Sequence, residues 1–277
     1  MTEQTLATAT PEGTASYLSR GIKDLLEQFP QLGDVLGAFN IGCVTCAVGT
    51  CELNDIVKYH YLPEDQLQDL MGQITAVIDP EGTIEPVRSK APSVQAVPRE
   101  ITYSPPMQQL VDEHTLIKRW LELIPSIIAC IDLEQESDRQ LMRDGIDFIR
   151  SYADRFHHAK EEDILFKHFD ENQEIIRVML ADHATGRNHV KAMVESVETR
   201  DRAVLAEHLT GYKELLCEHI KKEDDILYPW MDHQMSITQI GELFQEFAVA
   251  DGRSEPGMTE RFEQFIARLE QSQNTEK

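Results

Sequence analysis

The sequence predicts an all-α protein, an up-down-up-down four-helix bundle preceded by a small helical domain that contains cysteines. Apolar residues recur at helical spacing along most of the chain. Segments 157–170 and 219–232 are identical at seven of fourteen positions without a gap, which indicates two related helical hairpins. From residue 105 onward the breaks between periodic segments are short, as is typical of antiparallel neighbours in a bundle.

The charge of the chain limits the classes of partner. Among 277 residues there are 26 Lys and Arg against 49 Asp and Glu, a net charge of −23. Such a surface repels the phosphates of nucleic acids and of anionic membranes, so we expect neither as a partner. No apolar run has the length of a membrane span, and the N-terminus lacks the features of a secretory signal. We therefore expect a cytoplasmic protein.

The first third of the chain is expected to form a separate small domain. We predict a disordered N-terminus over residues 1–15 and a helical Cys-containing domain over residues 16–78, with helices on both sides of a Cys-rich loop. Residues 79–105 contain several Pro and Gly residues and no sustained apolar period. This composition predicts an extended linker.

The bundle is expected to occupy residues 106–233. Ser104 and Pro105 offer an N-cap and a first-turn proline for its first helix, and Pro125 is expected to kink that helix. Residues 234–277 are expected to add two amphipathic helices that either pack across the bundle or mediate dimerisation. The four long helices are predicted near residues 105–131, 137–168, 172–198 and 201–231.

The repeat selects one His-x3-Glu pair in each hairpin. Segment 156–166, FHHAKEEDILF, can be read with either of two such pairs. The second copy has only one, His219 with Glu223, so the alignment selects His157 with Glu161. Residues four apart lie on one face of a helix, so each pair can hold a metal ion.

A second motif precedes each copy. His114 and His183 each follow an acidic residue and stand four positions before a basic one. Apolar residues share the face of each His, which indicates that both side chains point into the bundle. Together the four helices would bring four imidazoles and two carboxylates to the middle of the bundle.

This set of ligands favours a binuclear centre. Two ions that share two carboxylates would each have two His nitrogens and two Glu oxygens, and an oxo or hydroxo bridge would leave an open position on each. Mixed imidazole and carboxylate ligation suits iron or manganese, and we take iron as the first choice. The candidate ligands are His114, His157, Glu161, His183, His219 and Glu223.

Residues 114–232 resemble the hemerythrin-like, HHE-type cation-binding family through the segments DEH, HHAKEEDILF, ADHATGR and HIKKEDDILYP. The resemblance implies a non-haem di-iron site on the same six positions. Oxygen-carrying hemerythrins have a further His one turn after the third-helix ligand, where this chain has Arg187. The departure argues against a simple oxygen carrier, because it would leave both irons open.

With its Cys-containing domain the chain is also similar to di-iron proteins that repair iron–sulfur clusters after nitric oxide or oxidative damage. The segment LLEQFPQLGDVLGAFNIGCVTC carries this similarity. An adjacent cysteine pair is usual in those proteins, whereas this chain has Cys43-x2-Cys46-x4-Cys51. We interpret the three thiols as a candidate second metal, iron–sulfur or redox site, with a reduced loop as the alternative.

Polar residues near the ligands have open interpretations. Glu113, Asp182 and Arg187 are candidates for orienting metal-bound imidazoles, although the first two could equally be solvated helix residues. Tyr212 could line an approach channel or belong to the core, and we assign His208 to the core. Surface or helix-end positions are expected for His158, Glu162, His168 and His233, and buried thiols for Cys130 and Cys217.

Two classes of function are compatible with these features. In the first, a di-iron centre reacts with nitric oxide or oxygen in a stress response or in cluster repair, as an oxidoreductase or an iron donor. In the second, a non-enzymatic protein senses or stores a gas or iron and acts through a partner. Candidate partners are an electron donor, an iron–sulfur client protein and a second copy of the chain.

Overall fold

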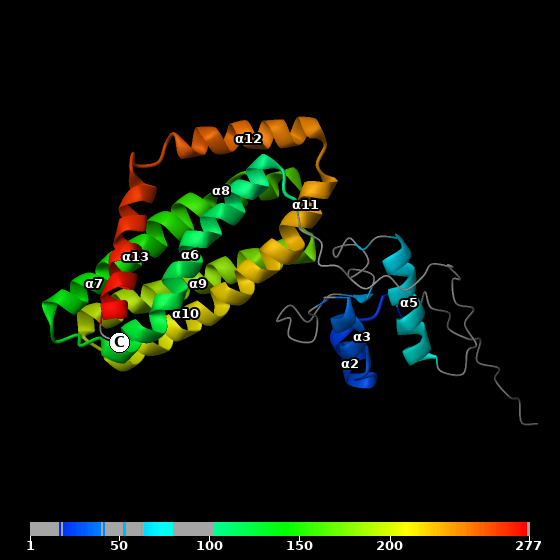
Figure 1. Ribbon diagram of the computed structural model, residues 1–277, viewed down its shortest axis with the longest axis horizontal. Helices are drawn as coiled ribbons and strands as arrows, with labels where there is room; N and C mark the ends of the chain where they lie inside the picture. The colour runs from blue at the N-terminus through cyan, green and yellow to red at the C-terminus, as the bar shows by residue number, and fades with distance from the viewer. Residues whose placement is uncertain are drawn as a thin grey trace, which may run out of the picture. The chain divides into compact units, whose positions relative to one another are not determined.

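The computed structural model divides the chain into two compact units, Met1–Glu100 and Ile101–Lys277, which are described separately (Figure 1). It describes residues 17, 19–39, 41, 52–53, 62, 64–79 and 102–275. The predicted N-terminal segment and most of the predicted linker lie outside these residues. The candidate thiols Cys43, Cys46 and Cys51 lie outside them as well.

The described part of the first unit is a small helical cluster. It contains α2 (Ile22–Gln28), α3 (Leu32–Ala38) and α5 (Glu64–Ile78). Apolar residues at helical spacing meet in one core, in which Leu25, Leu36 and Leu70 are completely buried. The only β-type pairing among the described residues is an isolated bridge between Gly21 and Glu52.

The second unit contains a four-helix bundle, so the prediction of an all-α fold with such a bundle is confirmed. The first helix is α6 (Pro105–Cys130) and the third is α9 (Glu174–Thr199). The second consists of α7 (Glu136–Phe148), the π-helical η1 (Ile149–His158), α8 (Ala159–Asp163) and the short 3₁₀ helix η2 (Leu165–His168). The fourth consists of α10 (Arg202–Lys222), the π-helical η3 (Glu223–Leu227) and α11 (Tyr228–Gln234).

Contacts between neighbours close the four helices into a ring. α6 packs against α10, α10 against α9, α9 against α7 and η1, and η1 against α6. Apolar residues form the core at the end of the bundle away from the polar centre, with Trp120, Phe148 and Leu209 completely buried. A Cβ atom at Gly145 would lie 2.3 Å from the Trp120 ring, so α7 meets α6 closely only because residue 145 is a glycine.

Local signals mark some of the helix boundaries. The backbone of Ser104 is extended before Pro105, but its N–H donates to Asp232 and its hydroxyl makes no cap. α6 continues past Pro125 to Cys130. The α9–α10 turn has Arg200 in the left-handed region at φ 59°, and the Asp201 carboxylate accepts from two N–H groups at the start of α10.

The C-terminal extension packs against the bundle. It forms α12 (Ile237–Asp251), which a Ser236–Gln239 capping box begins, and α13 (Met258–Thr275). Both contact α6, and α13 runs beside the bundle in Figure 1. Phe262 and Ile266 of α13 are buried in the bundle core. Of the two alternatives predicted for this segment, packing across the bundle is the one that the structure shows.

The prediction for two cysteines was wrong. Cys130 and Cys217 are both exposed, whereas we expected both to be buried. Each lies on the solvent side of its helix, because the core faces of α6 and α10 are already filled by residues such as Ile127 and Leu216. No helix among the described residues combines the length and the apolar character needed to cross a membrane.

Candidate metal centre

Two pairs of histidines from four different helices face each other inside the bundle. The Nε2 atoms of His114 and His157 are 2.9 Å apart, and those of His183 and His219 are 3.0 Å apart. All four side chains are buried. The helix faces predicted from periodicity therefore bring these imidazoles together.

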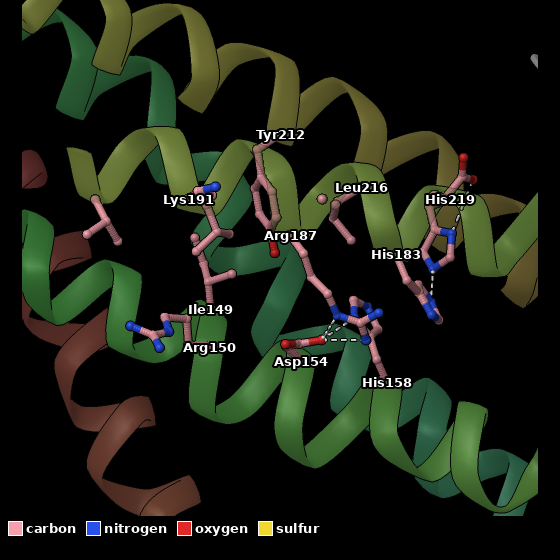
Figure 2. Close-up of a pocket in the computed structure, with 14 residues that line it drawn as sticks. Ile149, Arg150, Asp154, His158, His183, Arg187, Lys191, Tyr212, Leu216 and His219 are labelled. Atoms are coloured by element: carbon pink, nitrogen blue, oxygen red, sulfur yellow. Dashed lines mark hydrogen bonds and ion pairs between the residues drawn. The ribbon is translucent and has the colours of Figure 1, made fainter. Parts of the chain in front are cut away.

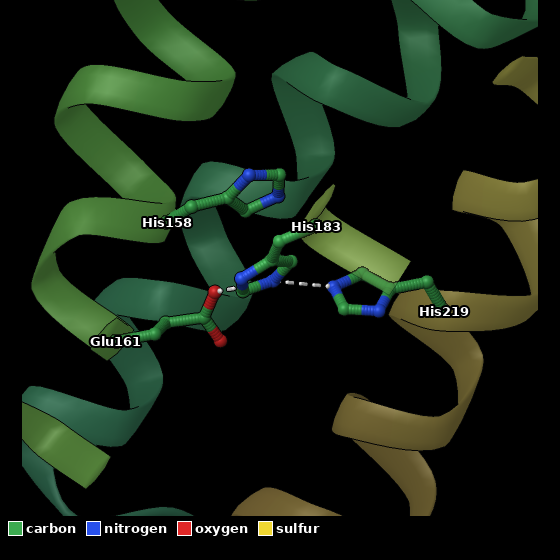
Figure 3. Close-up of side chains that lie close together, drawn as sticks. All are labelled: His158, Glu161, His183 and His219. Atoms are coloured by element: carbon green, nitrogen blue, oxygen red, sulfur yellow. Dashed lines mark hydrogen bonds and ion pairs between the residues drawn. The ribbon is translucent and has the colours of Figure 1, made fainter. Parts of the chain in front are cut away.

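Each pair belongs to a group of possible metal ligands whose donor atoms lie within 4.8 Å of one another. We call the group of His114, His157 and Glu223 the first half-site. The second half-site contains His158, Glu161, His183 and His219. Figure 3 shows the second half-site, with the Glu161 carboxylate beside His183 and with His219 on the opposite side.

The Nδ1 atom of each paired imidazole faces a carboxylate. The distances are 2.7 Å from His114 to Asp224 and 2.9 Å from His157 to Glu113. In the other pair they are 2.6 Å from His183 to Glu162 and 3.3 Å from His219 to Asp182. An Nδ1–H group that donates to a carboxylate leaves the Nε2 lone pair free. In both pairs the free lone pairs therefore point at each other.

Facing lone pairs fit a bound cation. Two unprotonated nitrogens 2.9 or 3.0 Å apart repel each other, so each pair needs a cation beside both atoms, either a metal ion or, in the metal-free site, a proton on one Nε2 atom. Against the effect of burial, Glu223 and Asp182 raise the pKa of His219 to about 9, which agrees with such a proton in its pair. Imidazole nitrogens bind transition metals at about 2.1 Å, so two of them at right angles on one ion are about 3 Å apart. The observed separations match that arrangement in both half-sites.

The carboxylates of Glu161 and Glu223 connect the two half-sites. Glu223 lies 3.3 Å from His114 Nε2 and 3.0 Å from His219 Nε2. Glu161 lies 3.8 Å from His157 Nε2 and 3.4 Å from His183 Nε2. Both carboxylates are completely buried. Each one thus reaches an imidazole of both half-sites, as a bridging ligand must.

Three of the four oxygens of these two carboxylates lack a hydrogen-bond donor among the described residues. Glu161 Oε2 and both oxygens of Glu223 have no hydrogen-bond partner among the described residues, and Glu161 Oε1 accepts from the Tyr228 hydroxyl at 2.6 Å. Burial and the neighbouring Glu223 raise the pKa of Glu161 well above its usual range. Burial acts the same way on Glu223, but the imidazoles of His219 and His114 hold its pKa well below the usual range. Cations between the carboxylates would allow both to be ionised.

A basic residue holds every carboxylate that orients an imidazole. Lys160 contacts Glu113, and Lys222 lies 2.6 Å from Asp182. In the same way, Lys118 lies 2.6 Å from Asp224 and Arg187 lies 2.7 Å from Glu162. These ion pairs fix the positions of the four carboxylates, which fixes the imidazole rings in turn. Burial nevertheless raises the pKa of Glu113 to about 7.

Sequence reasoning found part of this outer layer. Glu113 and Asp182 each precede a ligand on their own helix, and for that reason each reaches the His of the neighbouring helix, His157 or His219. Sequence reasoning did not assign Asp224, Lys118, Lys160 and Lys222 to the site. The internal repeat could have identified them, because each of these residues is aligned with an acidic or basic residue in the other copy.

The prediction for His158 and Glu162 was wrong. His158 is only 6% exposed, and its ring stacks on His183 with 3.9 Å between the centroids. Burial and His183 lower its pKa to about 3, so the ring is neutral. Glu162 is half-buried and accepts from His183 and Arg187. The expectation assumed a regular α-helix, but His158 ends a π-helical segment, which contains more residues per turn.

The remaining predicted positions lie outside the cluster. His168 ends η2, His233 is exposed on α11, and half-buried His208 contacts His189 on α9. Tyr212 is buried in the core and also lines a cavity of about 340 Å³ beside the second half-site (Figure 2). Arg187 lines the same cavity and donates to Asp154 as well as to Glu162.

Comparisons with known proteins agree with this geometry. The model of the hemerythrin HHE cation binding domain matches residues 106–231. An uncharacterized protein of Mycobacterium bovis and one of Mycobacterium tuberculosis are each 22% identical to this chain over 149 residues. The match covers 50% of this chain and 58% of each relative, so the chain spans little more than half the length of these relatives. No solved structure matches the chain.

Proposed function

We propose, from the premise that residues 106–231 are a hemerythrin HHE cation-binding domain, that this protein holds two iron ions and reacts with nitric oxide or oxygen. One observation carries the proposal. Two pairs of imidazole Nε2 atoms face each other at 2.9 and 3.0 Å, and two buried carboxylates reach both pairs. Each imidazole pair can bind its own ion and the two carboxylates can bind both ions, so the arrangement fits two neighbouring ions better than one.

The choice of iron rests on the chemistry of the ligands. Nitrogen and carboxylate oxygen, without thiolate, suit iron and manganese. His114, His157 and Glu223 would hold one ion, and His183, His219 and Glu161 the other, with both carboxylates shared. His158 offers a neutral imidazole to the second ion only. When bound, the two irons supply electrons to a small gas molecule.

The surrounding residues orient the centre and exclude water. The Tyr228 hydroxyl donates to Glu161 Oε1, which favours the ionised form of this carboxylate and fixes its orientation. Rings cover the imidazoles on both sides: Tyr228 stacks on His114 and Phe166 on His183, with 5.6 and 6.5 Å between centroids. These rings exclude bulk water, which favours entry of a small molecule through the cavity at the second half-site.

The physiological role we propose is nitrosative or oxidative stress response, including iron–sulfur cluster repair, in the cytoplasm. The N-terminal cysteines would then pass electrons or iron between the bundle and a client protein. A Cys43→Ser, Cys46→Ser double variant is expected to keep its two irons and to lose reductive turnover or repair activity. Full activity of that variant with physiological reductants would instead assign the function to the bundle alone.

Metal analysis and rapid mixing test the proposal. The protein is loaded with ferrous iron under anaerobic conditions, freed of excess iron and assayed for iron and manganese per chain. We expect two irons, the Mössbauer signature of a coupled pair after oxidation, and rapid reaction with nitric oxide. Oxygen should oxidise the centre irreversibly. A single ion per chain, or preferential loading of manganese, would contradict the proposal, and reversible oxygen binding over many cycles would indicate a carrier.

A further inference from the structure

The cavity beside the second half-site extends along several helical turns. Three helical segments form it: η1, α9 and α10 (Figure 2). Its residues on α9 extend from Asp182 to Val194, a helical rise of about 18 Å. The volume of about 340 Å³ lies within the range of small-molecule sites. These dimensions suit a chain-like organic molecule as well as a gas.

One end of the cavity consists of imidazoles. His158, His183 and His219 line it, whereas none of the ligands of the first half-site does. Figure 2 places these three residues at one end and Arg150 and Lys191 at the other. A molecule that fills the cavity therefore has one end near the second half-site and the other near the two basic residues.

The charges along the cavity are balanced except at that second end. Arg187 pairs with Asp154 and Glu162, and Asp182 pairs with Lys222. In the part of the chain that the structure describes, neither the Arg150 nor the Lys191 side chain has an ion pair or hydrogen bond. Two unpaired cations at one opening are unexpected in a chain with a net charge of −23, and they would attract an anionic group.

Apart from the ion pair of Asp154 with Arg187, the rest of the wall is mainly apolar. It consists of Ile149, Val190, Val194, Tyr212 and Leu216. Gly186 adds no side chain, and a Cβ atom there would only touch Leu216 and Tyr212 at 3.7 Å. Toward the imidazole end, the basic groups Arg187 and Lys222 are already paired with Asp154 and Asp182, so they leave no unpaired cation there for an anionic group. A ligand that fits this pattern has a single anionic head at the opening and an apolar body inside.

We propose that this cavity binds a monocarboxylate with a short apolar chain. The carboxylate lies between Arg150 and Lys191, and the end of the apolar chain points toward His158, His183 and His219. The proposal deepens the proposed function and rests on it in one respect, the presence of a metal ion at the second half-site. Binding of the carboxylate itself depends only on residues that line the cavity.

Calorimetric titration with hexanoate tests the binding site. The full chain is measured with iron under anaerobic conditions and without metal, and 1-hexanol and acetate serve as probes that lack the charge or the apolar body. We expect hexanoate to bind at least about tenfold more tightly than either. Arg150→Gln with Lys191→Gln should weaken hexanoate binding by about tenfold or more. The double variant Arg177→Gln, Lys221→Gln removes the same charge from exposed positions outside the cavity and should bind hexanoate normally.

Proton NMR of hexanoate tests its orientation. Bound iron broadens the signals of nearby protons, so the terminal methyl group should broaden more than the methylene next to the carboxylate. Equal affinity in the Arg150, Lys191 double variant, equal affinity for acetate, or stronger broadening next to the carboxylate would each overturn the proposal. Hexanoate binding by a chain that takes up no iron would support the cavity and contradict the proposed function. A chain that binds two irons but no hexanoate would support the proposed function and contradict the proposed binding of a carboxylate in the cavity.

Discussion

The first and second half-sites repeat one design with a few changes. In both, an Nε2 pair faces the centre, an acidic residue of a neighbouring helix accepts from each Nδ1 atom, and a basic residue holds that acid. The differences are few. In the repeat, His158 of the second half-site corresponds to the buried Ile220, and Phe166 corresponds to Tyr228. These differences make the second half-site distinct from the first, and the cavity lies beside the second half-site.

The largest effect is expected where the two half-sites are joined. Glu223→Gln replaces a carboxylate that lies within 3.3 Å of His114 and 3.0 Å of His219, so it should weaken both half-sites. We expect the iron content to fall from two to fewer than about one per chain, because each ion loses an anionic ligand. Metal analysis after anaerobic loading measures this. The exposed Glu218→Gln is the control, and retention of two irons by Glu223→Gln would show that the half-sites do not share it.

A second experiment separates the half-sites through adjacent residues. His157→Ala removes one of the paired imidazoles and should cost the ion of the first half-site. His158→Ile installs the residue of the equivalent repeat position and should leave both ions at saturating iron, with about tenfold weaker binding at the second half-site. Competition with a chelator measures both affinities. Equal loss of metal in the two variants would mean that the repeat does not identify the ligands.

The outer carboxylates offer a test of the symmetry itself. Glu113→Gln and Asp182→Asn each remove the carboxylate that accepts from one imidazole, His157 or His219. Loss of such an acceptor is expected to weaken metal binding by about 10- to 100-fold at the half-site concerned. Stepwise chelation resolves the two ions, and the exposed Asp112→Asn controls for the loss of charge. If both variants weaken the same ion, the assignment of the half-sites is wrong.

The smallest effect is expected from the tyrosine that breaks the symmetry. Tyr228→Phe removes the donor to Glu161 and makes this position like Phe166 of the other copy. The buried Glu161 oxygen then has no partner, so we expect the metal-free protein to lose about 1 to 3 kcal/mol of unfolding free energy. Urea unfolding measures the change. Phe166→Tyr is the matched variant, because it adds a hydroxyl at the equivalent position of the other copy without providing a donor to Glu161. If this variant gained as much stability as Tyr228→Phe loses, the proposed difference between the two half-sites would be wrong.

The sequence alone determined much of the bundle and of the inner site. Predicted helices at 105–131 and 172–198 correspond to α6 (Pro105–Cys130) and α9 (Glu174–Thr199), because apolar periodicity and breakers are local properties of the chain. The structure also brings together the six residues predicted as ligands. The repeat made this possible, since it compared each candidate with an equivalent residue in a second copy.

Only the tertiary structure decided which residues surround those ligands. Periodicity assigned His158 to another face, but the π-helical η1 changes the number of residues per turn, and the structure buries this ring against His183. Asp224 and Glu162 accept from imidazoles of other helices, and such contacts depend on how two helices are rotated and shifted against each other. A periodic pattern describes the face of one helix and contains no information on that relation. The cavity between η1, α9 and α10 has the same origin, because three helices define it together.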